Sequence, residues 1–483
     1  MSEPRELPDR IAVAGDGPLG VLAAIALRRA LPTTEVLVLA LAPGPAAFAE
    51  RVGTALPFSN RLHDRLGIAE EDLVRRAGAS HRLVMRYFGG GRPGQQGAAG
   101  YGAAVDPAMT TAFAREWGGG PRNAGTAVPP RSLGEVLAAA GRFAPPSGEP
   151  DHPLAELDYA LRWNVAGYRD LLIATAQRLG VRHAKAAVSG LRPDRSGGIA
   201  ALVLEGGGEI EADLFVDCTG PQALLLSQLP ETRQIDWQDR LPARRVAFAA
   251  SAEPMLALED RATLTRLGWR WEVAGRDGRL ALLALGEEAD GDALAEQLGA
   301  AAEIVPHMPG RAAVPWLGNV VALGDAAARL EPLGGIAQDL AHRQLALLLE
   351  LLPGRTPDPS ERAEYNRRAS LMADRAADWL AAHYAAPAAA KLFPGLARSA
   401  ELERALDQFT RRGRTPFTEE APMLVQEWGT LLHALGLPTG EGPLAAARSG
   451  SGEDAARAFA ARAEAALRVA PPYAEWMQRT LAG

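Results

Sequence analysis

The 483-residue chain contains very little cysteine and lysine, and each shortage narrows what the protein can do. Its single cysteine, Cys218, excludes an internal disulfide and any metal site built from several cysteines. Only two of its 51 basic residues are lysines, Lys185 and Lys391. A catalytic side-chain amine could therefore come from these two positions alone.

The sequence also lacks long apolar runs and an excess of positive charge. No stretch approaches the ~20 consecutive apolar residues that a membrane span needs. Residues 1–10 contain no apolar signal core, so we expect a cytoplasmic protein that has no membrane association. The net charge is −7 and the basic residues are scattered, so we expect no nucleic-acid partner.

The most informative pattern is a glycine-rich turn near the N-terminus. An apolar run over 10–14 leads into Gly15, Gly17 and Gly20, and a helical pattern and a second apolar run follow. In such a turn the glycines allow a tight bend and a close approach to a diphosphate, which binds at the helix N-terminus. We therefore predict a dinucleotide site that includes Pro18 and Leu19, the alternative being a βαβ unit with an empty turn.

The rest of the chain predicts an α/β protein. A second glycine-rich copy over 89–94 has no helical pattern after it, so we expect a loop there, in an irregular region over 91–150. The other expected elements are a strand over 82–88, a helix over 168–179, a meander of short antiparallel strands (181–187, 200–205 and 209–213), a buried parallel strand over 214–220, and mostly helices beyond Ile336.

A second candidate site follows a buried strand over 319–323. Gly324 and Asp325 end this strand, where a carboxylate can accept hydrogen bonds from the hydroxyl groups of a sugar chain. Pro332, Gly334 and Gly335 then lead into a helix, whose free N–H groups suit another negatively charged group. Together with the N-terminal turn, this spacing resembles the two FAD-contacting segments of flavin monooxygenases.

Further segments narrow the resemblance, and the chain looks like a member of the flavin-dependent tryptophan halogenase family over nearly its whole length. The matching segments are 212–220, 330–333, 365–384, 413–416, 427–428 and 442–445. The resemblance implies an FAD-binding, Rossmann-like domain over 1–360, with substrate-facing sheet at about 80–165 and 235–315, and a helical, substrate-covering region over 361–483. The residues it implies for FAD binding are Gly15, Gly17, Pro18, Leu19, Gly20, Arg51, Gly324, Asp325, Pro332, Gly334 and Gly335.

The resemblance also implies the chemistry and the partners. In this family a separate flavin reductase supplies reduced FAD, and oxygen and halide give hypohalous acid. This oxidant crosses a tunnel to a lysine beside an aromatic substrate. A Trp-x-Trp-x-Ile-Pro motif marks the tunnel entrance, and a homodimer is a further expectation.

This chain departs from the family pattern at several of these positions. We align His81 with the lysine, and we assign catalysis to His81 and Glu331. Trp269 and Trp271 remain without the Ile-Pro ending. The segment that binds halide in the family is shortened here, so only the backbone at Gly335 and Ile336 could bind halide, and weakly. The glutamate that the family has in the segment aligned with 53–56 is absent. Ala40 occupies the usual place of an acid that binds the ribose, and Glu35 comes too early.

The sequence therefore supports three functions. The first is an FAD-dependent oxidoreductase that acts on an aromatic, for example indolic, substrate, with halide use left open. The second is a flavin monooxygenase on the same scaffold, because the segments at 324–327 and 332–335 are closer to hydroxylases. The third is a flavin-binding homologue that has lost its chemistry. His152 and His183 have no companion ligands, so no metal is expected.

Overall fold

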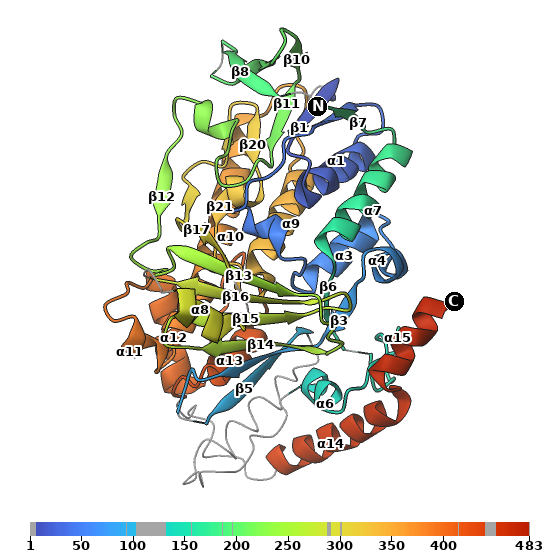
Figure 1. Ribbon diagram of the computed structural model, residues 1–483, viewed down its shortest axis with the longest axis vertical. Coiled ribbons are helices and arrows are strands. Elements are labelled where there is room, and N and C mark those ends of the chain that lie inside the picture. The colour runs from blue at the N-terminus through green and yellow to red at the C-terminus, as the bar shows by residue number, and fades with distance from the viewer. Residues whose placement is uncertain are drawn as a thin grey trace.

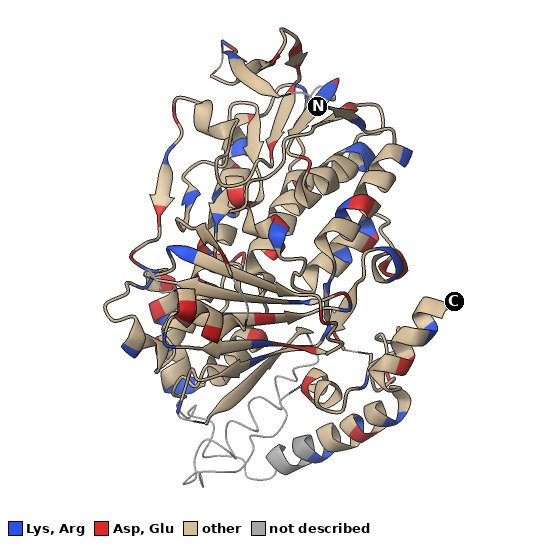
Figure 2. Cartoon of the chain, in the orientation of Figure 1, with Lys and Arg blue, Asp and Glu red and all other residues tan. Residues whose placement is uncertain are grey.

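The computed structural model describes the chain in two main sheets surrounded by helices (Figure 1). The described residues are 6–92, 94–102, 132–155, 157–185, 187–195, 197–286, 291–299, 302–413, 415–439 and 451–482, with the backbone alone for 451–456. Part of the expected substrate-facing region, 103–131, and the matching segment 442–445 lie outside them. Acidic and basic residues are interspersed over both halves (Figure 2).

The first sheet has six strands in the order β19-β20-β11-β1-β2-β7, and all pairings are parallel except β19 with β20. Its strands are β1 (Arg10–Ala14), β2 (Glu35–Leu39), β7 (Arg182–Ala184), β11 (Leu214–Asp217), β19 (Trp316–Leu317) and β20 (Val320–Ala322). Ile11 and Val13 belong to the cluster that includes α1, whereas Ala12 and Ala14 belong to the cluster of the meander. Both faces of β1 are covered, which explains its unbroken apolar run.

Helices and a small sheet cover the two faces of this sheet (Figure 1). The helices are α1 (Pro18–Ala30), α7 (Val165–Arg178) and α9 (Ile336–Glu350). The small sheet is the meander β8 (Val188–Pro193), β9 (Ile199–Leu204) and β10 (Glu209–Glu211). The expected helix over 168–179 and the parallel strand at 214–217 are confirmed.

Two of our secondary-structure predictions were wrong. Residues 182–184 do not begin the meander: β7 runs parallel to β2, because it follows the crossover helix α7 and returns to the edge of the parallel sheet. The region 91–150 is not wholly irregular, since it contains β5 (Gln96–Gly100) and α6 (Leu133–Ala139). The turn over 89–94 does link two strands, but its glycines gave no sign that β5 pairs with β4.

The second sheet has seven strands in the order β17-β13-β16-β15-β14-β4-β5. Its other strands are β4 (Val84–Phe88), β13 (Arg245–Ser251), β14 (Glu259–Leu264), β15 (Trp269–Ala274), β16 (Arg279–Leu285) and β17 (Glu303–Pro306). The strand expected over 82–88 is split, because β3 (Ser80–Arg82) pairs with β6 (Ala160–Arg162) before β4 joins the seven-stranded sheet. The break falls at Leu83, whose N–H donates to the carbonyl of Leu258.

The C-terminal third is helical, as expected. It contains α10 (Pro359–Tyr384), α11 (Ala389–Leu392), α12 (Ala400–Arg412), α13 (Val425–Ala434), α14 (Ser451–Val469) and α15 (Tyr473–Ala482). Shorter elements elsewhere are α2 (Phe48–Arg51), α3 (Phe58–Arg65), α4 (Glu70–Arg76), α8 (Gly291–Leu298), β12 (Gln234–Asp236), β18 (Gly310–Ala312) and β21 (Ala328–Arg329). Within the described residues, every helix is too short or too polar to cross a bilayer.

A buried Arg–Asp–Arg cluster joins the β3–β6 pair to the seven-stranded sheet. Asp260 on β14 accepts hydrogen bonds from Arg82 at 2.7 Å and from Arg162. All three side chains are almost fully buried. Buried charges are tolerated only when they are paired, so Asp260 compensates for much of the cost of burying the two arginines.

We predict that Asp260→Asn strongly destabilises the fold. The substitution keeps the shape of the side chain but leaves two buried guanidinium groups without a counter-charge, which costs about 3–5 kcal/mol. Urea unfolding followed by circular dichroism measures the change. Asp407→Asn is the matched control, because it breaks an exposed ion pair with Arg411 and should change stability little. Equal stability of the two variants would contradict this role of Asp260.

Candidate functional site

The two candidate segments meet at one edge of the six-stranded sheet. β1, β11 and β20 are parallel neighbours, and their register aligns Ala14 with Asp217 and Asp217 with Ala322. The turns that follow β1 and β20 therefore begin at the same level. A Cβ atom added to Gly324 would lie 2.5 Å from Cδ2 of Leu19. The expectation that the glycine turn and the Asp325 segment converge in space is confirmed.

The N-terminal turn has the geometry of a phosphate-binding loop. Gly15 has φ of +119°, and a Cβ atom there would lie 2.5 Å from the carbonyl oxygen of Cys218. A Cβ atom on Gly20 would lie 2.0 Å from the carbonyl oxygen of Gly15, so α1 packs against the strand only with glycine there. The first turn of α1 contains no acidic residue, and its N-cap residue, Gly17, has no side chain that could cap it. These N–H groups could bind the diphosphate of a dinucleotide.

The side chain of Glu50, which the sequence analysis missed, lies against this loop. It belongs to the short helix α2, and its Oε2 accepts a hydrogen bond from the N–H of Leu19 at 2.9 Å. A Cβ atom on Gly17 would lie 2.0 Å from the same oxygen. Burial raises the pKa of Glu50 to about 8, and the nearby charges of Asp325 and Asp16 add to this shift. No motif marks Glu50, so only the three-dimensional packing identifies it.

Asp325 is buried beside the glycine turn and has one free oxygen. Its Oδ2 accepts a hydrogen bond from the N–H of Ala49 at 2.8 Å, whereas Oδ1 is buried with no partner. Burial raises the pKa of this carboxyl to about 7. An unpaired buried acceptor is costly unless a ligand uses it, so Oδ1 could accept a hydrogen bond from a sugar-chain hydroxyl.

The turn at Gly334 and Gly335 leads into α9, as expected. The two glycines have φ of +66° and +80°, and added Cβ atoms would lie 2.5 Å from Trp379 and 2.6 Å from the carbonyl oxygen of Thr54. Their close packing explains why glycine is needed at both positions. The N–H of Gly335 faces the carbonyl of Pro332 at 3.5 Å, and the N–H of Ile336 donates to Leu333. The two amides suggested for halide therefore already have partners within the turn.

His81 and Arg82 are adjacent on β3, but their side chains contact different parts of the structure. The Nε2 of His81 lies 2.9 Å from Glu70 and its Nδ1 lies 3.0 Å from the hydroxyl of Tyr473 on α15. Burial lowers the pKa of His81. Arg82 instead donates to the carbonyl oxygens of Ala55 at 2.9 Å and Gly334 at 3.3 Å. The side chain that reaches the Gly334 turn is thus Arg82.

A catalytic role for His81 stays a prediction, whereas Arg82 is a residue that the sequence analysis missed. Successive side chains in a strand point to opposite faces. Shifting the alignment by one residue would therefore put Arg82, instead of His81, at the position of the family's lysine. The Nε of Arg82 is buried without a partner. Both lysines, Lys185 and Lys391, are exposed.

Arg51 lies on α2, but its guanidinium group turns toward the second sheet. It lies 4.1 Å over the ring of Phe248, pairs with Glu303 and donates to the carbonyl of Pro45. Arg51 thus contacts one residue each of β13 and β17, in addition to Pro45. The early acid Glu35 lies at the start of β2, where it pairs with Arg10 and Arg182.

Glu331 is a further buried carboxyl group with an unused oxygen. The hydroxyl of Tyr384 donates to its Oε2 at 2.6 Å, and its Oε1 is buried without a partner. Burial raises the pKa of Glu331 to about 7, so the group can gain or lose a proton near neutral pH. Trp269 and Trp271 share one face of β15 and are buried. The indole N–H of Trp269 donates to the carbonyl of His383 at 3.2 Å, and that of Trp271 has no partner.

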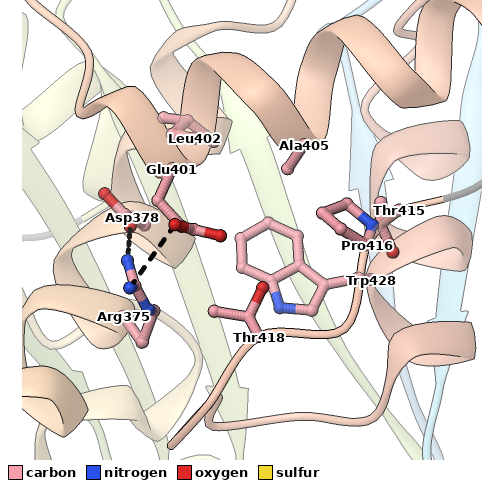
Figure 3. Close-up of a pocket in the computed structure, with 9 residues that line it drawn as sticks. All are labelled: Arg375, Asp378, Glu401, Leu402, Ala405, Thr415, Pro416, Thr418 and Trp428. Atoms are coloured by element: carbon pink, nitrogen blue, oxygen red, sulfur yellow. Dashed lines mark hydrogen bonds and ion pairs between the residues drawn. The ribbon is translucent and has the colours of Figure 1, made fainter.

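A separate pocket lies between α10, α12 and α13. The helices α12 and α13 lie beside the seven-stranded sheet, away from the six-stranded sheet (Figure 1). The residues that line the pocket are Arg375, Asp378, Glu401, Leu402, Ala405, Thr415, Pro416, Thr418 and Trp428. Figure 3 shows Arg375 between Asp378 and Glu401, with which it pairs at 3.0 and 3.7 Å. Arg375, the one basic residue of this lining, is thus already paired with both of its acidic residues. Across the described ranges, no cluster of histidine, cysteine and acidic residues is suited to a metal ion.

Comparisons with known proteins agree with this geometry. The chain is 25% identical over 420 residues to the tryptophan 7-halogenase RebH of Lentzea aerocolonigenes, covering 78% of this chain and 76% of that protein. It is 30% identical over 247 residues to the 7-chloro-L-tryptophan 6-halogenase KtzR of Kutzneria sp. (strain 744), covering 48% and 47%. BrvH, a flavin-dependent halogenase from Brevundimonas sp. BAL3, has the same fold, with a TM-score of 0.86 at 23% identity and coverage of 98% and 99%.

The family assignment rests on nearly the whole chain. The sequence profile named tryptophan halogenase matches residues 10–449, which include both sheets, the glycine turn, the Asp325 segment and most of the C-terminal helices. The chain therefore belongs to the tryptophan halogenase family.

Proposed function

We propose that this protein uses reduced FAD and oxygen to halogenate an electron-rich aromatic substrate such as an indole. As a member of its family it is a flavin-dependent oxidoreductase. Reduced FAD, supplied by a separate flavin reductase, provides the electrons that activate oxygen. The observation that carries the proposal is the convergence of the glycine turn and Asp325 at one sheet edge within a chain that matches this family throughout.

The residues present suit FAD along this edge. Leu19 and the other amides at the start of α1 would bind the diphosphate, and Oδ1 of Asp325 would accept a hydrogen bond from the ribityl chain. The tight turn at Gly334 and Gly335 would face the ring system. Arg51 makes its contacts elsewhere, so its assignment to the cofactor has the weakest support among these residues.

On the substrate side, three groups support the chemistry. Arg82 carries a fixed positive charge next to the Gly334 turn, where it would orient an anion or a polarised oxidant. Glu331 would accept the proton that an aromatic carbon loses on substitution. The buried pair Trp269 and Trp271 would exclude water from the path between cofactor and substrate.

The reaction that we propose balances as follows. Substrate C–H, halide, O2, reduced FAD and one proton give substrate C–halogen, oxidised FAD and two molecules of water. The hydrogen-bonded amides of Gly335 and Ile336 favour a second candidate, hydroxylation, in which oxygen itself is inserted and one water is released. The cytoplasmic location, the homodimer and the division at residues 360/361 stay predictions.

We predict that product formation from indole depends on halide. Reductase, oxygen and the protein with bromide should give a product heavier by bromine minus hydrogen, read by mass spectrometry. A product that contains oxygen from labelled O2 without halide would favour the hydroxylase. Flavin oxidation with neither product would contradict both candidates.

We predict that Asp325→Asn weakens FAD binding. The amide retains one acceptor for Ala49 but loses the charged acceptor for a sugar hydroxyl, which corresponds to about a tenfold loss of affinity. Titration of flavin fluorescence measures it. Asp378→Asn is a matched control, since Asp378 is also a buried, hydrogen-bonded carboxyl group but lines the separate pocket. Equal affinity of the Asp325 variant and the parent would argue against this cofactor position.

We predict that the turnover rate rises as the pH passes about 7 and that Glu331→Gln removes this rise. Burial raises the pKa of Glu331 to about 7, so the carboxyl is protonated below that pH and can accept a proton only above it. Steady-state rates between pH 5.5 and 8.5 test this, and Glu427→Gln serves as the buried control. A parent and a Glu331 variant with the same pH profile would exclude Glu331 as the base.

A further inference from the structure

The carboxyl group of Glu50 lies where a dinucleotide's diphosphate would bind. Its Oε2 accepts a hydrogen bond from the N–H of Leu19, in the first turn of α1. The same oxygen lies 2.0 Å from the position of a Cβ atom on Gly17, the glycine that would allow a diphosphate to approach the backbone. The carboxyl group and the diphosphate would therefore compete for one amide and one space.

Other acidic groups surround Glu50. Asp325, in the turn after β20, and Asp16, in the turn before α1, both raise its pKa. Arg169 on α7 opposes them, but it is paired with Asp16 at 2.6 Å. The charge of Glu50 also raises the pKa of the Cys218 thiol, which directly follows β11. The neighbouring residue Arg51 turns toward Phe248 and provides no neutralising contact.

We propose that Glu50 is an intramolecular competitor for the FAD diphosphate, so that the cofactor binds only when this carboxyl group leaves the N–H of Leu19. The inference rests on the flavin-dependent assignment above. Because Glu50 takes the place of a phosphate oxygen, the N–H of Leu19 has a hydrogen-bond acceptor even without the cofactor. The competition lowers the affinity for FAD, which suits a cofactor that arrives reduced from another protein and must leave after oxidation.

The charge state of Glu50 adds a pH dependence. Burial raises its pKa to about 8, so the group is neutral at pH 7 and anionic at pH 9. A bound diphosphate would raise this pKa further by repulsion, so FAD binding takes up a proton above pH 8. The affinity should fall about tenfold between pH 7 and pH 9, as expected for one linked proton. Burial raises the pKa of Asp325 to about 7, so Asp325 ionises at lower pH than Glu50, and its charge raises the pKa of Glu50.

The test is the dissociation constant of oxidised FAD, from flavin fluorescence at pH 7 and pH 9. Glu50→Gln keeps an acceptor for Leu19 but cannot ionise, so it should match the parent at pH 7 and lose the additional weakening at pH 9. Glu50→Ala removes the competitor and should bind FAD about fivefold more tightly than Glu50→Gln at both pH values, as expected for one lost hydrogen bond. Riboflavin, which lacks the diphosphate, should bind all three proteins equally.

Glu427→Gln is the matched control, because Glu427 is also a buried glutamate that accepts backbone hydrogen bonds, but from Gly102 and Leu424. It should leave FAD affinity unchanged at both pH values. Identical FAD affinities for the parent and both Glu50 variants, or equal changes for riboflavin, would overturn the inference. A parent that binds no flavin at all would instead refute the proposed function. The pH dependence of the parent tests the inference even if a variant fails to fold.

Discussion

The parallel register of β1, β11 and β20 is the constraint on which the candidate site depends. Parallel strands end at the same edge, so residues that lie more than 300 positions apart in the sequence begin their turns side by side. This edge brings Gly17, Glu50 and Asp325 together. The helix α2 is fixed there from both sides, because Asp325 accepts from Ala49 while Glu50 accepts from Leu19.

The carboxyl groups of this region share one physical property. Glu50, Asp325 and Glu331 are buried, and desolvation raises the pKa of each into the range from about 7 to about 8. The interior is therefore less negatively charged near neutral pH than its composition suggests. Arg82 keeps its charge next to the Gly334 turn because Asp260 pairs with it. Buried carboxyl groups whose pKa values lie near neutrality are typical of functional sites.

The sequence predicted those features that local patterns specify. Gly15 directly follows an apolar strand and Asp325 comes shortly after another, so their place at the sheet edge could be inferred. Other features depend on packing between distant segments. Glu50 has no motif, and β7 could not be distinguished from a meander strand because its partner β2 lies far away in the sequence. Whether His81 or Arg82 corresponds to the family's lysine depends on a shift of one residue in the alignment. Such a shift matters because neighbouring side chains in a strand point to opposite faces.

The single thiol lies directly against the glycine turn. A Cβ atom on Gly15 would touch both the carbonyl oxygen and the Cβ of Cys218, and burial raises the pKa of this thiol. A thiol in this state reacts only when the surrounding backbone separates enough to admit water and reagent. With no other cysteine in the chain, the labelling rate of the unmodified protein would report how often the first βαβ unit opens. A ligand that stabilises the glycine turn could thus be recognised because it slows the alkylation of Cys218, without any engineered probe.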